Sequence, residues 1–301
     1  MPLTRRQMLA GMAAAAARAR AQSRPRQVST RATSALCLYS QVLVKVDYND
    51  LGPILRGLGF DGCDLSVQRG GHVAPEKATL DLMPALEAMT GAGLEVPMIT
   101  TSFTSAADPL ARNVLFLAGV VQVPLFIPGH WHLGGALDLL GSGMVQRDLI
   151  GLASIAGGYG LATAIPNFVD AQGSGTVEGF NPLLRGIDPK WVGWDFDIGY
   201  ATAQAGEEGW QAAFQMAMPR LKAVTLRDFT WTKEAGSDRK MTPCPLGQGV
   251  VDWPHFFAML AGAKFTGPIT LHTDYRPKEE LPAIRQDVQF VKKQIASAYR
   301  G

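Results

Sequence analysis

Two aspartates, Asp197 and Asp274, stand at the polar ends of apolar runs that alternate like buried strands. If both side chains point into a barrel, they lie where water is scarce, and a negative charge there needs a partner. A divalent metal, a Lys or Arg side chain, or sugar hydroxyls would each meet that need. Two such carboxyl groups can also remove a proton next to a carbonyl and return it elsewhere. We therefore predict that Asp197 and Asp274 form a catalytic acid/base pair; a pair of structural carboxylates is the alternative.

Four of the five histidines also follow predicted strands. His130 and His132 are two residues apart, so in an extended segment both rings point the same way and could join His72 or Asp197 in a transition-metal site. The alternative, which we favour, is that they flank Trp131 in a loop that either stacks on a sugar or caps the barrel.

Other polar residues at the strand ends complete the predicted substrate site. Arg227 or Lys233 would neutralise the charge of an enolate. His272 shares the side-chain parity of Asp274, so in a regular strand both face the same side; a core histidine is the alternative. Asp228 is predicted to form a structural ion pair or to cap a loop. The predicted substrate-binding residues are His72, His130, Trp131, His132, Asn167, Arg227, Lys233 and His272.

The elements that position these residues are clearest in the stretch 242–276. Apolar residues recur at helical spacing over 253–264, with Asp252 as the predicted N-cap. A buried strand is predicted over 268–275 because apolar and polar residues alternate after Gly267-Pro268. A helix thus leads into a strand whose polar end carries Asp274.

The same alternation covers the rest of the chain and predicts a single-domain α/β fold, a (β/α)8 TIM barrel over residues 34–301. A doubly wound open sheet is the alternative, but no Gly-rich nucleotide fingerprint follows the first strand. The predicted strands are 35–39, 62–67, 95–102, 121–127, 161–168, 191–198, 221–229 and 268–275. The predicted helices are 49–58 with Asn49 as its cap, 75–92, 109–118, 136–157, 178–184, 201–218, 253–264 and 279–298.

The N-terminus has the pattern of an export signal. Thr4-Arg5-Arg6-Gln7-Met8-Leu9 is a twin-arginine pattern, a short alanine-rich run follows, and Ala19-Arg20-Ala21 fits a cleavage site. We predict a Tat signal peptide over 1–21, a mobile leader over 22–33, and a periplasmic or exported protein. An alanine-rich helix with a basic start is the alternative. The run is too short to span a bilayer, which needs about 20 apolar residues.

The charge balance argues against nucleic acid as a partner. The chain has a formal net charge of +2, and removing 1–21 would remove four arginines and no acidic residue. No basic stripe then remains to bind a phosphate backbone.

Several segments resemble the xylose-isomerase-like sugar phosphate isomerase/epimerase family, over nearly the whole chain after the predicted signal. They are Phe60 to Val67, Gly70-Gly71-His72-Val73, Leu94 to Thr101, Arg227-Asp228-Phe229, Cys244 to Gly249 with Val251-Asp252, and Leu271 to Tyr275. The resemblance implies a TIM barrel in which strand-end carboxylates and histidines hold a divalent metal that polarises a sugar carbonyl.

Asp197 matches one of the family's metal ligands, Asp274 stands where the family usually has glutamate, and Asn167 lies near a third ligand position. The resemblance therefore implies Mn, Zn, Mg or Co as cofactor. The chain departs from the family where it usually has histidine or glutamate, at Phe168, Tyr200, Thr225 and Gln248.

The predicted function is that of a sugar isomerase or epimerase acting on a small carbohydrate by proton transfer next to a carbonyl. A non-catalytic sugar-binding barrel, and a periplasmic lyase or hydrolase of modified glycosides, are the alternatives. A homo-oligomer is compatible with the sequence.

Overall fold

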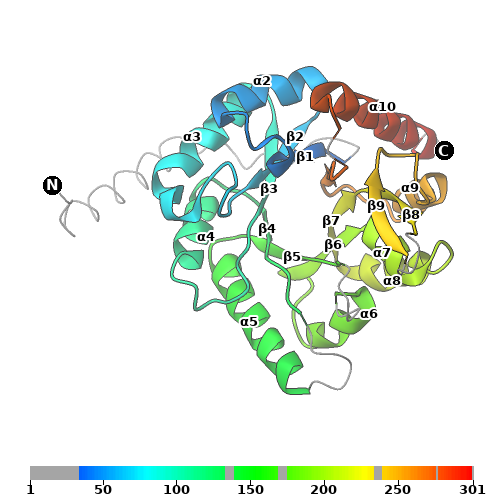
Figure 1. The fold of residues 1–301 in the computed structure, drawn as a ribbon. Coiled ribbons are helices and arrows are strands. Elements are labelled where there is room, and N and C mark those ends of the chain that lie inside the picture. The colour runs from blue at the N-terminus through cyan, green and yellow to red at the C-terminus, as the bar shows by residue number, and fades with distance from the viewer. Residues whose placement is uncertain (1–33, 133–138, 169–174, 234–238, 276, 300–301) are drawn as a thin grey trace, which may run out of the picture.

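Eight parallel strands close into a barrel in the computed structural model, in the order β1-β10-β7-β6-β5-β4-β3-β2, and helices surround it (Figure 1). The structure describes residues 34–132, 139–168, 175–233, 239–275 and 277–299. The predicted TIM barrel is therefore confirmed, and the open sheet is wrong. The predicted signal peptide 1–21 and leader 22–33 lie outside the described residues.

The bounds of the elements follow the predicted alternation closely. The strands are β1 (Leu36–Tyr39), β2 (Gly62–Ser66), β3 (Glu95–Thr100), β4 (Leu125–Ile127), β5 (Ala162–Pro166), β6 (Val192–Asp197), β7 (Leu221–Leu226), β8 (Asp228–Thr232), β9 (Lys240–Cys244) and β10 (Ile269–Leu271). The helices are α2 (Tyr48–Leu58), α3 (Ala78–Gly91), α4 (Ala111–Val120), α5 (Leu139–Gly158), α6 (Val177–Phe180), α7 (Ile198–Ala205), α8 (Trp210–Ala217), α9 (Trp253–Gly262) and α10 (Glu280–Ala298).

Local side chains set the helix ends. Asp252 caps α9 as predicted, because its carboxylate accepts from the backbone N–H of His255 at 3.3 Å. Helix α2 ends at Gly59, whose φ of 100° suits the left-handed conformation that only glycine adopts easily. The prediction that Asn49 caps α2 is wrong: Asp47 does so, by accepting from the backbone N–H of Asn49 at 2.9 Å.

Two apolar clusters form the core. The larger one lies between the strands and the helices and includes Trp194 and Phe196 of β6 packed with Phe214 and Phe256. The smaller one consists of side chains from the barrel strands and from the residue before β1: Ala35, Cys37, Met98, Leu125, Ile127, Ala164 and Ala223. Because side chains alternate along β6, Asp195 and Asp197 face the interior while Trp194 packs outward.

Three predicted elements are corrected. The helix predicted over 201–218 is two helices, α7 and α8, because the chain breaks at Gly206, where φ is 81°. The strand predicted over 221–229 ends at Leu226, and the chain turns away into an antiparallel hairpin of β8 and β9 that the sequence analysis missed. The strand predicted over 268–275 ends at Leu271.

Among the helices that the structure describes, none has the length and apolar character needed to cross a bilayer.

Candidate active site

A cavity of about 1070 Å³ opens at the carboxyl ends of the barrel strands. Its wall contains the last residues of several strands, among them Tyr39 of β1, Thr100 of β3 and Asp197 of β6. Met241 and Pro243 of β9 extend the wall on the side of the hairpin. In barrels of this kind the functional site lies at this end, and the cavity is large enough for a small ligand.

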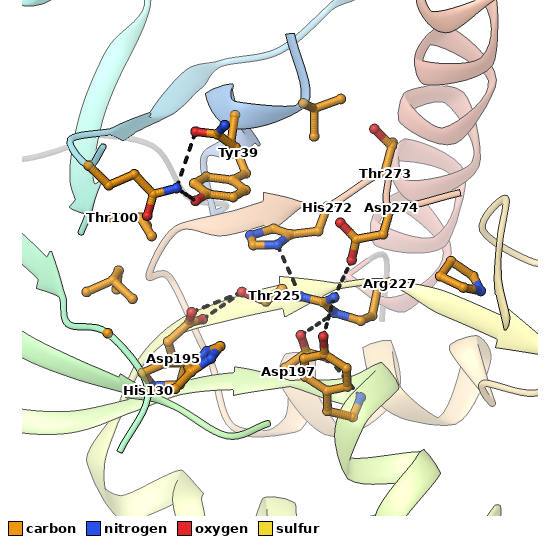
Figure 2. A pocket seen from close by; sticks show the side chains of 18 of the residues that line it. Tyr39, Thr100, His130, Asp195, Asp197, Thr225, Arg227, His272, Thr273 and Asp274 are labelled. Carbon is orange, nitrogen blue, oxygen red and sulfur yellow. Dashed lines mark hydrogen bonds and ion pairs between the residues drawn. The ribbon is translucent and has the colours of Figure 1, made fainter. Parts of the chain in front are cut away.

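Arg227, between β7 and β8, joins the carboxylates of Asp197 and Asp274 (Figure 2). Its Nε donates to Asp197 Oδ2 at 2.5 Å, and its Nη1 donates to Asp274 Oδ2. Nη1 also donates to the Tyr200 hydroxyl at 3.0 Å, and Nη2 donates to Nδ1 of His272 at 3.1 Å. The arginine side chain, only 11% exposed, is thus fixed by four partners.

The charges around Arg227 keep it protonated. Burial lowers the pKa of the guanidinium, but the neighbouring Asp197 and Asp274 outweigh burial, and the net effect is a raised pKa. The Tyr200 ring adds a cation-π contact, with 4.0 Å between its centre and the guanidinium carbon.

Asp197 is held in place by its neighbours. Asn167 Oδ1 accepts from the backbone N–H of Asp197 at 2.7 Å, and Asn167 Nδ2 donates to its backbone carbonyl at 3.0 Å. Asp197 also caps α7, because its Oδ1 accepts from the backbone N–H of Tyr200 at 2.9 Å. Burial raises the pKa of Asp197 to about 6, and Arg227 limits this rise. Asn167, predicted to bind substrate or metal, therefore positions Asp197.

His272 is a neutral imidazole that presents one N–H donor. Burial and the charge of Arg227 hold its pKa well below the ordinary value of 6.5. Since Nδ1 accepts from Arg227, the proton of the neutral ring is on Nε2. The ring stacks on Tyr39, with 4.4 Å between centres and 15° between planes.

His130 also lines the cavity as a neutral ring. It stacks on Phe168 with 4.4 Å between ring centres. Burial lowers its pKa to about 4, with a smaller contribution from Arg227. His130 and His272 can therefore bind hydroxyl groups but do not carry charge at neutral pH.

Asp195 is a cavity residue that the prediction of site residues missed (Figure 2). Thr225 Oγ1 lies 3.0 Å from both of its carboxyl oxygens. Burial raises its pKa to about 8, with the nearby Asp64 and Asp197 adding to the rise. Asp195 therefore holds a proton at neutral pH. Its parity along β6 matches that of Asp197, so the sequence contained the signal.

Asp228 caps a loop, as one of the two predicted roles requires. Its carboxylate accepts from the backbone N–H groups of Gly247, Gly249 and Val251 and from Nε1 of Trp253. These bonds fix the loop between the hairpin and α9.

Four predicted substrate-binding residues lie outside the residues that line the cavity. His72 Nε2 is 3.1 Å from the backbone oxygen of Val46. Trp131 is buried, and its Nε1 donates to the backbone oxygen of Thr104 at 2.7 Å, so it packs rather than stacks on a ligand. His132 and Lys233 are exposed. His130, Asn167, Arg227 and His272 do line the cavity.

The residues that would hold a divalent metal do not fit one as they are arranged. Arg227 lies between the two aspartates. The side-chain oxygen and nitrogen of Asn167 are both bonded to the backbone of Asp197. Within the described ranges no three His, Cys, Asp or Glu residues gather as a metal-binding group. A hard divalent cation needs several free oxygen ligands, which these residues do not offer in this arrangement.

A scan against protein-family models matches residues 53–294 to the family described as xylose isomerase-like TIM barrel. The match covers most of the chain and agrees with the resemblance in the sequence. A search of curated protein sequences finds no match.

Solved structures with the same fold include proteins of different activities. A xylose isomerase-like TIM barrel protein from Mycobacterium smegmatis in complex with magnesium has a TM-score of 0.65 and 15% identity, covering 89% of this chain and 97% of that one. E. coli 3-keto-D-glucoside 4-epimerase has a TM-score of 0.67 and 14% sequence identity, and the match covers 87% of this chain and 100% of that one. D-Psicose 3-epimerase with D-tagatose from Clostridium cellulolyticum H10 has a TM-score of 0.65 and 12% sequence identity, and the match covers 87% of this chain and 99% of that one. At these identities the likeness shows the fold alone.

Proposed function

Because the chain belongs to the xylose isomerase-like TIM barrel family, we propose that it is an isomerase or epimerase that moves a proton next to the carbonyl of an unphosphorylated carbohydrate. One observation carries the proposal. The cavity combines a fixed guanidinium, carboxylates that can accept a proton and a buried carboxyl group, Asp195, that already holds one. Structural neighbours that are sugar epimerases agree with this class of reaction.

The charge of the cavity favours a neutral substrate. Among the described residues that line the cavity, the cations are Lys45 and Arg227, against four carboxylates when Asp195 is protonated. Those carboxylates belong to Asp197, Asp228, Asp274 and Glu280. This excess of negative charge repels a phosphate group, whereas sugar hydroxyls are unaffected. The same conclusion follows from export, which we propose on the twin-arginine pattern at Arg5-Arg6.

Each group has a role in the proton transfer. Asp274, with 40% of its side chain exposed, accepts the proton from the carbon next to the carbonyl. The electron pair of that C–H bond moves into the C–C bond, and the carbonyl oxygen takes the proton of Asp195 or remains an enolate beside Arg227. Delivery of a proton to the opposite face of the same carbon gives an epimer, while the enol oxygen returns its proton to Asp195. Delivery of the proton from Asp274 to the former carbonyl carbon gives an isomer, while the hydroxyl on the deprotonated carbon loses its proton and becomes the new carbonyl. Asp197 holds Arg227 in position.

Several groups in the wall can bind sugar hydroxyls. His272 offers its Nε2–H, and the neutral ring of His130 lines the same cavity. The stacked rings of Tyr39 and His272 supply an apolar edge next to these donors.

Exchange with heavy water tests the proposal. The purified protein is incubated in D2O with neutral aldoses, ketoses and 3-keto-glucosides, and deuterium at the carbon next to the carbonyl is followed by NMR. We expect incorporation together with a new epimer or isomer. Asp274→Asn should slow it by about 100-fold or more. Glu207→Gln, on an exposed turn, is the control and should match the wild type.

Two other results would contradict the proposal. Sugar binding without deuterium exchange would indicate a non-catalytic sugar-binding barrel. Release of a shorter sugar from a glycoside without exchange would indicate a lyase or hydrolase.

A further inference from the structure

A cation already occupies the space between Asp197 and Asp274. The two carboxylates approach each other from β6 and from the segment after β10, and Arg227 lies between them with Nε on one and Nη1 on the other (Figure 2). Two negative charges at the end of a barrel must be compensated by a positive one, and the guanidinium supplies it.

The lone pairs that face Arg227 are engaged by it. Oδ2 of Asp197 and Oδ2 of Asp274 each accept from Arg227, and so does Nδ1 of His272. The other carboxylate oxygen of Asp197 accepts from the backbone N–H of Tyr200. A metal ion at this place would have to displace the guanidinium from all three side chains while remaining near its positive charge.

The position of Arg227 is fixed by the fold. It is the single residue between β7 and β8, so two ordered strands hold its backbone from both sides. Gly199 allows this packing, because a Cβ there would lie 2.3 Å from Cγ of Arg227. The guanidinium is therefore a preorganised cation that needs no rearrangement when a substrate binds.

We propose that Arg227 takes the place of a divalent metal in this cavity, so that the protein holds no metal between Asp197 and Asp274 and polarises the substrate oxygen with a guanidinium N–H. The catalytic part of this inference rests on the function proposed above, whereas the part on metal binding does not. Of the five N–H groups of Arg227, four bind the partners named above, and the second N–H on Nη2 is left for the substrate oxygen in the described part of the site.

Metal titration tests the inference without a substrate. Wild-type protein, Arg227→Ala and Arg227→Lys are treated with EDTA and titrated with Mn²⁺ in a calorimeter, and untreated wild type is submitted to elemental analysis. We expect no bound metal in the wild type. Arg227→Ala should bind Mn²⁺ at least about tenfold more tightly, because Asp197, Asp274 and His272 lose their common partner. Arg227→Lys keeps a positive charge there and should resemble the wild type.

Arg220→Ala is the matched control. This arginine lies just before β7, and its Nη2 donates to the backbone oxygen of Leu184 at 3.2 Å, away from the cavity lining. Its removal should leave Mn²⁺ binding at the wild-type level, and EDTA should leave wild-type turnover unchanged.

The opposite results are equally definite. Stoichiometric metal in the wild type overturns the inference, even if every variant fails to fold. A folded Arg227→Ala protein that binds Mn²⁺ no better than the wild type also overturns it. Absence of deuterium exchange with every sugar, together with the expected metal titrations, would refute the proposed function and leave the metal-binding part standing.

Discussion

At the scale of single residues, neighbouring charges give two equally buried carboxyl groups different protonation states within one cavity. Asp195 has the carboxyl groups of Asp64 and Asp197 near it, whereas Asp197 has Arg227 at hydrogen-bonding distance. Burial raises the pKa of both, to about 8 for Asp195 and about 6 for Asp197. Near pH 7 Asp195 is therefore protonated and can donate a proton, whereas Asp197 is ionised and pairs with Arg227.

We predict that Asp195→Asn changes how stability depends on pH. The pKa of Asp195 is raised from 3.8 to about 8, so the folded state binds its proton more tightly than the unfolded state does. This contribution to stability is present at low pH and is lost as pH rises through 8. The difference in the free energy of unfolding between variant and wild type should therefore shift in favour of the variant by at least about 1 kcal/mol from pH 5 to pH 9, which is roughly 2–4 °C in Tm.

Thermal unfolding at several pH values measures this difference. Burial raises the pKa of Asp64 to about 7, so the stability of the variant still falls to some extent as pH rises. Glu207→Gln serves as the exposed control. Parallel curves for wild type and Asp195→Asn would show that Asp195 is ionised in the folded protein at pH 5.

At the scale of elements, the hairpin β8–β9 and the loop after it depend on one carboxylate. Asp228 accepts from three backbone N–H groups of the loop and from Trp253. Gly249 lies so close that a Cβ there would be 2.1 Å from Asp228 Oδ1. The hairpin in turn contributes Met241 to the cavity, which Asp228 also lines, so this carboxylate fixes part of the wall of the site.

We predict that Asp228→Asn destabilises the protein by about 3 kcal/mol, because an amide cannot accept from all these donors and turns its own N–H groups toward them. Gly249→Ala should also destabilise the protein. Urea unfolding measures both, and Asp188→Asn, on the exposed turn before β6, is the control. An unchanged urea midpoint in Asp228→Asn would mean that the loop is held by other contacts.

The sequence predicted the barrel well because buried parallel strands and amphipathic helices have distinct periods. The alternation of Trp194 and Asp197 gave the correct faces of β6. The hairpin was missed because residues 221–229 were interpreted as one strand, although Arg227 interrupts the strand. The break between α7 and α8 was missed because one glycine at 206 does not end a helical pattern by itself.

The candidate site was less predictable than the fold. Strand ends give the face on which a side chain lies but not its partners, so the contact of Arg227 with both Asp197 and Asp274 required the three-dimensional arrangement. Trp131 looked like a stacking residue, yet its indole is buried and bonded to a backbone carbonyl. The position of a residue after a strand does not show whether its side chain lines the cavity or packs in the core.

At the scale of the whole molecule, export remains a prediction that the described residues do not reach. We predict that replacing both Arg5 and Arg6 by lysine keeps the protein in the cytoplasm, because the twin-arginine pathway requires this pair. Fractionation of cells expressing a tagged full-length chain measures the distribution. Equal amounts of wild type and variant in the periplasm would argue against the signal.

The closure of the barrel has a consequence for the order of events during synthesis. β1 pairs with β10, Leu36 beside Ile269, so the first barrel strand has its final neighbour only after almost the entire chain has been made. Contacts between residues so far apart in sequence form late, because the intervening loop must close first. The nascent chain therefore leaves the ribosome with an open sheet edge at β1, and the cell must shield that edge until translation ends.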